Sequence, residues 1–494
     1  MAVFDKKSEK GNNIERSSII PDELLLLGIS AFLIFFLEDY LRLLVPNDPG
    51  IVANSVGYVL VFFVLTVSYF PKKIPRSHYI IVGVTALFLR LRVLFFKPVV
   101  SSDLHRNLLF GSVLAGGWNP YLWTIETIPA LLEQGFVTKV SYIQEWVSHS
   151  YDYPALAILF FAAVTFFVPA DNYSAFVLAK SVLMLVDVAN AYLIYRTLKD
   201  HFGKEEVGKK MGLLYLLNPL AIFWVGLEGQ FEPIPLFFTF LSIYLVLSTH
   251  ETSIVPEKYQ FLIPYVAGLM LACGALFKYF PVFFVPAIIF FFGRQVKPII
   301  RFLSTFIFSS FLLSIPFVFS SYYVTNFVKF QINRTHHNLD EATFPLYIID
   351  VPFFLLIGAI LALSLFLIAK NRDRKQLMMW VGTATLFLFI VVNNSIFSWY
   401  VLWIFPTLFF TAVPQDEYSR SLYWGLGLSI YIVMWSPAEL EVMFQVIAVT
   451  AVLTLTSFRT QVKQQIFGLL GLGSYVAPIP SQSSQSNLPK NGEL

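Results

Sequence analysis

The sequence has little charge and a single cysteine. Asp, Glu, Lys and Arg make up 13% of the 494 residues, about half of the roughly 25% found in soluble domains. Because Cys273 is alone, the sequence excludes an internal disulfide and a metal cluster built from several thiolates. The formal net charge of +3 gives no reason to expect a nucleic-acid partner. No nucleotide-binding or metal-binding motif is visible, so we expect no cofactor.

What the sequence has instead is long apolar runs. Hydrophobic residues make up 57% of the chain, and many runs are long enough to cross about 30 Å of hydrocarbon. The sequence therefore predicts an all-α, polytopic transmembrane protein with about 12–15 spans. The N-terminal residues lack the pattern of a signal peptide, so we expect the first run to remain as a helix. The candidate spans are residues 24–45, 51–70, 79–96, 155–168, 173–198, 211–227, 234–248, 261–277, 282–292, 299–319, 346–369, 377–392, 396–413, 422–435 and 443–458.

The predicted organisation is one membrane domain with a polar tail at each end. Residues 1–21 are expected to form a cytoplasmic tail, and residues 22–460 the transmembrane domain. Residues 461–494 form a polar C-terminal tail that is expected to be partly disordered, because residues 478–494 are rich in Ser, Gln and Pro. The sequence predicts no long soluble domain.

Short loops rich in Lys and Arg predict the orientation, because such loops stay in the cytoplasm. Residues 71–76, 199–210, 293–297 and 370–375 are loops of this kind. With these loops and both termini in the cytoplasm, two long segments, 97–154 and 320–345, face the other side. The orientation has one inconsistency, because an odd number of spans is needed between residues 154 and 199. We favour a re-entrant or interfacial helix at 155–168; the alternative is that the charge rule fails there.

Polar residues collect on the predicted outer face. The segment 97–154 is rich in Trp and Tyr, which is typical of helices lying in the membrane interface. Its stretch SSDLHRNLLFGSVLAGGWNPYLW contributes a carboxylate and a guanidinium, and short outer turns (GLEGQFEP, LFKYFP) and the segment 320–345 contribute more polar side chains. The pattern therefore predicts one site at the outer membrane boundary. Its candidate residues are Asp103, Arg106, Asn119, Tyr121, Tyr153, Gln230, Glu232, Lys278, Tyr279, Arg334, His336 and His337.

These residue types fit the transfer of a sugar from a lipid-borne phosphate. A carboxylate such as Asp103 can accept the proton of an acceptor hydroxyl as the new bond forms. Cations such as Arg106, Lys278 and Arg334 can bind the phosphate as charge develops on the leaving group. His336 or His337 could orient the phosphate or the acceptor.

Simpler interpretations stand beside these. An interfacial Arg106 or Arg334 is often an anchor at the membrane surface. Two neighbouring histidines, His336 and His337, are often only solvated, and their spacing does not indicate a zinc site. Lys180 and Asp187 lie seven residues apart on one face of the predicted helix 173–198, where a structural pair and a functional role are both open.

Taken together, the motifs resemble those of the GT-C superfamily of integral-membrane glycosyltransferases, and of its polyprenol-phosphate mannosyltransferases and GPI mannosyltransferase-like group in particular. In that pattern Ser-Asp-x-x-Arg, Gly-x-Asn-Pro-Tyr, Tyr-Pro-Pro, Leu-Asn-Pro, Gly-Gln-x-Asp and Lys-Tyr-x-Pro follow one another. The chain carries the corresponding residues in the same order at 102–106, 117–121, 153–155, 217–219, 229–232 and 278–281. It departs from the pattern at Ala155, which replaces the second proline, and at Glu232, which replaces the aspartate.

The resemblance implies a GT-C fold with interfacial helices in the first outer loop, and Asp103 as the essential acidic residue. It implies transfer of a hexose, with mannose as the first choice, from a polyprenyl- or dolichyl-phosphate carrier to a glycolipid or glycan acceptor. The reaction would invert the configuration, so a β-linked donor would give an α-linked product. The site would face away from the cytoplasm, at the cell membrane of a prokaryote or the endoplasmic reticulum membrane of a eukaryote.

Two other classes of function remain open. A transporter or lipid flippase would place polar groups near the membrane midplane, often in repeated halves; here they gather at one predicted surface and no repeat is visible. A non-catalytic membrane subunit would not need the outer carboxylates at all.

Overall fold

The computed structural model describes residues 76–98, 101–123, 150–168, 173–216, 221–249 and 256–318, Tyr323, and short pieces at 374–375, 378–379, 381–382, 385–386 and 402–403. None of these residues forms a strand, which confirms the all-α class for this part of the chain. Both predicted tails, the first two predicted spans and most of the chain beyond residue 318 lie outside the described residues, and Arg334, His336 and His337 lie there with them.

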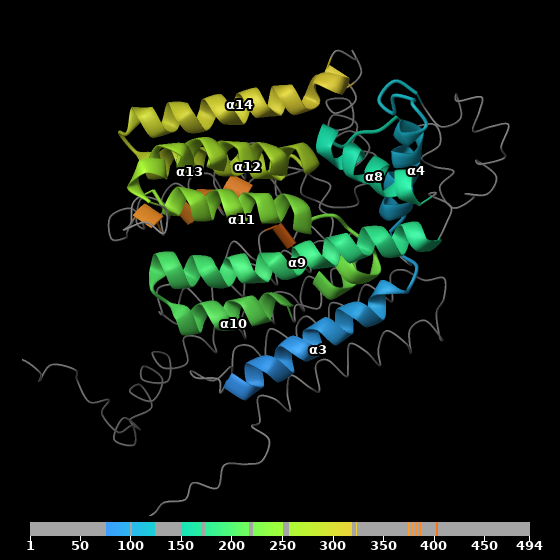
Figure 1. Ribbon diagram of the computed structural model, residues 1–494, viewed down its shortest axis with the longest axis horizontal. Helices are drawn as coiled ribbons and strands as arrows, with labels where there is room; N and C mark the ends of the chain where they lie inside the picture. The colour runs from blue at the N-terminus through green and yellow to red at the C-terminus, as the bar shows by residue number, and fades with distance from the viewer. Residues whose placement is uncertain are drawn as a thin grey trace, which may run out of the picture.

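The described helices form a layered bundle with a smaller pair at one end. In Figure 1, α14, α12, α11, α9, α10 and α3 lie side by side in that order, while α4 and α8 pack together near the first residues of α9. The elements are α3 (Arg76–Leu94), α4 (Asp103–Ala115), α8 (Ala155–Phe167), α9 (Tyr173–Phe202), α10 (Glu205–Leu216), the π-helix η3 (Ala221–Leu227), α11 (Pro233–Leu247), the 3₁₀ helix η4 (Glu257–Leu262), α12 (Ile263–Phe277), the 3₁₀ helix η5 (Phe280–Phe284), α13 (Val285–Phe292) and α14 (Val296–Val318).

Three of the described helices are long and apolar enough to cross a membrane. They are Tyr173–Phe202 with 30 residues, Glu257–Phe277 with 21 and Val296–Val318 with 23, and about 20 helical residues span 30 Å. Helix α14 also exposes large apolar side chains, among them Ile307 and Phe308 at more than 60%. An apolar helix face of this kind is what contact with lipid requires.

Helix α8 lies where the run 155–168 was predicted and is as short as the re-entrant or interfacial helix favoured there, whereas the predicted run 211–227 does not form one helix. Helix α8 has only 13 residues, or about 20 Å at 1.5 Å per residue, which is too short to cross the hydrocarbon. The predicted run 211–227 is divided between the end of α10 and η3. Most of the predicted loop 199–210 is helical, because its Lys and Glu residues favour helix, and Gly203 with φ of 63° makes the turn between α9 and α10.

A buried polar network holds α3 against α9 and α10. Arg90 of α3 donates to Asp187 of α9 through Nε (3.0 Å) and Nη2 (2.6 Å), and the Tyr215 hydroxyl of α10 donates to the same carboxylate at 2.5 Å. Lys180, two turns earlier on the same face of α9, donates instead to the carbonyls of Val93 and Phe96 at 2.8 and 2.7 Å. Lys180 and Asp187 therefore both contact the α3 region, and Lys180 fixes the end of α3 that leads into Asp103.

Glycines allow the close helix contacts on which this arrangement depends. A Cβ atom on Gly111 of α4 would lie 2.5 Å from the backbone carbon of Phe161 in α8, and one on Gly268 of α12 would lie 2.3 Å from the carbonyl oxygen of Phe302 in α14. Small residues let helix backbones approach this closely. The α4–α8 contact places the first turn of α4 beside the segment that precedes α8.

Candidate functional site

The site is built around Asp103, the first residue of α4. Its carboxylate is 14% exposed, and its Oδ2 accepts a hydrogen bond of 3.0 Å from Gln230 Nε2. The same Gln230 amide donates to Ser101 Oγ at 2.9 Å, and Asp103 N donates to that hydroxyl at 3.2 Å. A carboxylate at a helix N-terminus is stabilised by the helix dipole. Asp103 is therefore held in place by its neighbour Ser101 and by Gln230, which is far away in sequence.

The turn that carries Gln230 is fixed by its glycine. Gly229 has φ of 72°, and a Cβ atom at this position would lie 2.3 Å from Leu104 Cδ2, so no other residue fits without displacement. Glu228 Oε2 accepts a hydrogen bond from Ser101 N at 2.8 Å. The residues on both sides of Gly229 thus contact the segment immediately before α4.

Arg106 joins Asp103 to a second carboxylate, Asp152. Its Nη2 lies 3.4 Å from Asp152 Oδ1 and 3.9 Å from Asp103 Oδ1, and its guanidinium stands 4.9 Å from the centre of the Tyr153 ring. Burial alone would lower the pKa of Arg106, but the carboxylates of Asp152 and Asp103 raise it above its ordinary value. Arg106 is therefore a permanent, buried cation between two carboxylates.

Lys278 and Glu232 form a second buried ion pair in the same neighbourhood. Lys278 Nζ donates to Glu232 Oε1 and stands 4.9 Å from the Phe231 ring centre and 5.4 Å from that of Tyr153. Glu232 precedes α11 and Lys278 follows α12, so the antiparallel packing of these helices brings the two together. Burial raises the pKa of Glu232, although the charge of Lys278 opposes the shift.

Asn119 and Tyr121 support this region from the turn after α4. Asn119 Oδ1 accepts a hydrogen bond from Tyr121 N at 3.0 Å, as in an Asx turn. The buried Tyr121 hydroxyl donates to the carbonyl of Tyr153 at 2.7 Å. Burial raises the pKa of Tyr121 and of Tyr279, first by desolvation and then by neighbouring tyrosines and Asp152, so both remain neutral phenols. Tyr279 follows Lys278, the cation of the second ion pair.

Sequence reasoning missed Asp152 and Ser101. Asp152 is 8% exposed. It directly precedes Tyr153, and a carboxylate next to a motif residue could have indicated from the sequence that Asp152 belongs to the site. Three buried acceptor atoms of the site, Asp152 Oδ2, Gln230 Oε1 and Glu232 Oε2, have no hydrogen-bond partner in the part of the chain that the structure describes. Within that part, no group of three His, Cys, Asp or Glu residues is arranged to hold a metal ion.

Comparisons of the chain with protein-family models, with curated proteins and with solved structures found no match. Its function is therefore argued from the geometry of the site.

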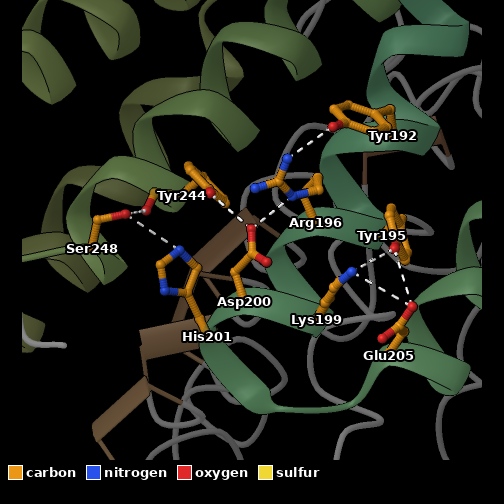
Figure 2. Close-up of polar contacts among 9 residues, drawn as sticks. All are labelled: Tyr192, Tyr195, Arg196, Lys199, Asp200, His201, Glu205, Tyr244 and Ser248. Atoms are coloured by element: carbon orange, nitrogen blue, oxygen red, sulfur yellow. Dashed lines mark hydrogen bonds and ion pairs between the residues drawn. The ribbon is translucent and has the colours of Figure 1, made fainter. Parts of the chain in front are cut away.

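A second polar cluster lies at the other end of α9. As Figure 2 shows, Asp200 accepts from Arg196 at 2.7 Å and from the Tyr244 hydroxyl of α11 at 2.9 Å, while His201 Nε2 lies 3.4 Å from Ser248 Oγ. Asp, His and Ser are the residues of a hydrolytic triad, but here the Asp200 carboxylate binds Arg196 and Tyr244, and Ser248 donates to the Tyr244 carbonyl at 2.9 Å. The triad geometry is therefore not formed. The cluster links α9 to α11.

An apolar pocket lies at the opposite end of α4 from Asp103, on the side of α14. Its volume is about 580 Å³, and it lies between the end of α4, the outer face of α8 and the end of α14, with Asn119 among its lining residues. Leu114, Leu159, Phe166 and Phe317 are among the side chains that line it. This volume is within the range of small-molecule sites.

Proposed function

We propose that the protein is a membrane glycosyltransferase of the GT-C type, which transfers a hexose from a polyprenyl-phosphate carrier to a lipid-linked or glycan acceptor on the extracytoplasmic face. The observation that carries the proposal is the contact between Asp103 and Gln230, because these residues belong to two motifs that lie 127 positions apart. Arg106, Tyr153, Glu232 and Lys278 belong to the same connected set of contacts. Motif residues from four separate segments thus belong to one connected set of contacts that includes Asp103.

In the proposed reaction Asp103 acts as the general base. It takes the proton of the acceptor hydroxyl while the hydroxyl oxygen bonds to the anomeric carbon and the bond from that carbon to the phosphate oxygen breaks. The polyprenyl phosphate leaves with the electron pair of that bond. A single displacement inverts the configuration, so a β-linked donor gives an α-linked product. Arg106 lies beside the base, and Lys278 joins the same set of contacts through Tyr153 and Glu232.

The apolar surroundings support a substrate carried by lipid. Three of the helices that the structure describes are long enough to cross a membrane, and the pocket between α4, α8 and α14 offers apolar walls beside Asn119. A polyprenyl chain buries apolar surface in such a pocket while its phosphate and sugar stay at the polar site. Asp103 at the start of α4 would then meet the head group of a substrate whose tail remains among apolar side chains.

The test of the proposal is transfer by the purified protein. In lipid nanodiscs it should use a polyprenyl-phosphate hexose as donor, without added divalent metal, and not a nucleotide sugar. Asp103→Asn keeps the shape of the side chain but cannot accept the proton, so turnover should fall by about 10²–10⁴-fold. Glu206→Gln, at an exposed carboxylate of α10, is the matched control and should leave turnover unchanged. Robust turnover with a nucleotide sugar, complete loss in chelator, or more than about a third of normal turnover in Asp103→Asn would refute the proposal.

The predicted orientation is tested by labelling cysteines. Ala115 at the end of α4 and Glu206 at the start of α10 are both exposed and lie at opposite ends of the bundle. In a Cys273→Ser background, Ala115→Cys should react with an impermeant thiol reagent added to intact cells, and Glu206→Cys only after the membrane is permeabilised. The reverse pattern would place the site in the cytoplasm.

A further inference from the structure

The site contains more hydrogen-bond acceptors than the protein itself satisfies. Asp152 Oδ2, Gln230 Oε1 and Glu232 Oε2 have no partner in the described structure, although these residues are 8%, 1% and 0% exposed. A buried polar atom without a partner costs free energy, and such atoms in native proteins call for an explanation. All three atoms are acceptors, so the group that completes them must donate hydrogen bonds.

The charges around these atoms restrict the chemistry of that group. Asp103, Asp152, Glu228 and Glu232 supply four carboxylates to the site, whereas Arg106 and Lys278 supply two cations. A phosphate beside the free acceptor atoms would be repelled by the carboxylates. A hydroxyl or an ammonium group can donate the hydrogen bonds that these atoms lack. Of these two, the substrate of the proposed reaction supplies hydroxyls, on its sugar.

We propose that Asp152, together with Gln230 and Glu232, binds the hydroxyl groups of the substrate sugar. This inference rests on the proposed function, because it assigns a role within the same site, and it adds Asp152 as a substrate-binding residue. Arg106 Nη2 fixes the position of Asp152 by holding Oδ1 at 3.4 Å, which leaves Oδ2 for the substrate. The sugar can belong to the donor or to the acceptor, since both present the same hydroxyls.

The arrangement of the two aspartates suits one sugar ring. Arg106 Nη2 lies 3.9 Å from Asp103 Oδ1 and 3.4 Å from Asp152 Oδ1. Because both carboxylate oxygens lie this close to one nitrogen, they are less than about 8 Å apart. A hexose carries hydroxyls around its whole ring, so it can contact Asp152 while a reacting oxygen lies at Asp103. Arg106 thus sets the spacing between the proposed base and the proposed sugar-binding carboxylate.

A binding experiment tests the inference without requiring turnover. The wild-type protein is placed in nanodiscs, because maltoside detergents would themselves present sugars, and binding is followed by tryptophan fluorescence. The probes are n-octyl mannoside and n-octyl glucoside, their fully O-methylated forms and n-octylammonium, all below micellar concentrations. At least one octyl glycoside should bind saturably, and its O-methylated form, which has no hydroxyl donors, should bind at least tenfold more weakly. Equal binding of the methylated form, tighter binding of the ammonium probe, or no glycoside binding would overturn the inference.

A matched variant then tests Asp152 itself. In Asp152→Asn, Arg106 keeps the amide oxygen on its own side, so an NH₂ group replaces Oδ2 as the atom that faces the substrate. Affinity for the octyl glycoside should fall by about 10–100-fold, as expected for a lost hydrogen bond to a charged group, while Glu206→Gln should bind normally. Normal glycoside affinity in Asp152→Asn would overturn the role of this residue. If the variant folds poorly, the comparison of methylated and unmethylated probes on the wild-type protein still tests whether the site binds sugar hydroxyls.

Kinetics identify the source of the sugar and separate this inference from the proposed function. A raised KM of Asp152→Asn for the lipid-phosphate sugar assigns the contact to the donor, and a raised KM for the glycan assigns it to the acceptor. Unchanged KM values for both would overturn the inference and leave the glycosyltransferase intact. Glycoside binding that depends on Asp152, without any transfer by the wild-type protein, would support the inference and refute the proposed function.

Discussion

Replacing Asp187 with asparagine should be among the most destabilising conservative changes in the described part of the chain. Asp187 is fully buried and Arg90 is 2% exposed. The carboxylate accepts two hydrogen bonds from Arg90 and one from Tyr215. Asparagine keeps the shape but leaves the Arg90 charge without a counter-ion. Removing one partner of a buried ion pair typically costs about 3–5 kcal/mol, a large share of the roughly 5–15 kcal/mol by which whole domains are stable.

The assay is the free energy of unfolding, measured by titration with SDS in mixed micelles. Glu206→Gln is the control: Glu206 forms an exposed pair with Lys209, and exposed pairs contribute little, so unfolding should be unchanged within error. The triple variant Arg90→Met, Asp187→Leu, Tyr215→Phe removes the charges and the hydroxyl that needs the carboxylate, and it should recover most of the loss. If Asp187→Asn cost less than about 1 kcal/mol, as surface pairs do, or if the triple variant were less stable than the single one, the reasoning would be refuted.

Two further predictions concern the site. Gly229→Ala should lower transfer at least tenfold and destabilise the protein, because the added Cβ would clash with the side chain of Leu104. Gly203→Ala is the control, since Gly203 also has a positive φ but has open space around it, and it should leave transfer unchanged. Equal losses of transfer in both variants would contradict the role of the contact between Gly229 and Leu104. Burial, and then the charge of Lys97, lower the pKa of His105 from 6.5 to about 4, so the folded protein favours the neutral ring. The contribution of His105 to the free energy of unfolding is therefore complete above pH 6.5 and is lost as the pH falls towards 4. His105→Leu should therefore reduce the difference in unfolding free energy between pH 7.5 and pH 5, and an unchanged difference would count against this assignment.

Much of the helical architecture was predictable because it depends on composition. Long apolar runs can satisfy their backbone groups only as helices in an apolar surrounding, and α9, α12 and α14 lie where such runs were expected. The helix boundaries were harder to predict. The charged stretch 199–210 has the composition of a loop between spans, but its Lys and Glu residues are also good helix formers, and only the turn at Gly203 interrupts the helices.

The contacts of the site were only partly predictable. The pairing of Glu232 with Lys278 follows from the antiparallel packing of two consecutive helices, α11 and α12, since the start of the first then lies beside the end of the second. The contact of Gln230 with Asp103 joins motifs that the resemblance had already grouped, although no local pattern gives its geometry. Asp152 was missed because periodicity says nothing about a residue in an irregular segment. Only the ion pair between Arg106 and Asp152 in the folded protein shows that Asp152 belongs to the site.

The network that joins α3 to α9 has a consequence for the order in which the protein is made. Arg90 leaves the ribosome 97 residues before Asp187, its counter-ion. During that interval the guanidinium of Arg90 lacks the buried carboxylate that it contacts in the folded protein. The contacts that hold α3 in its final position therefore cannot form before α9 has been synthesised. Since the residues after α3 lead directly to Asp103, the segment that carries the proposed base can take its final position only after α9 has been synthesised.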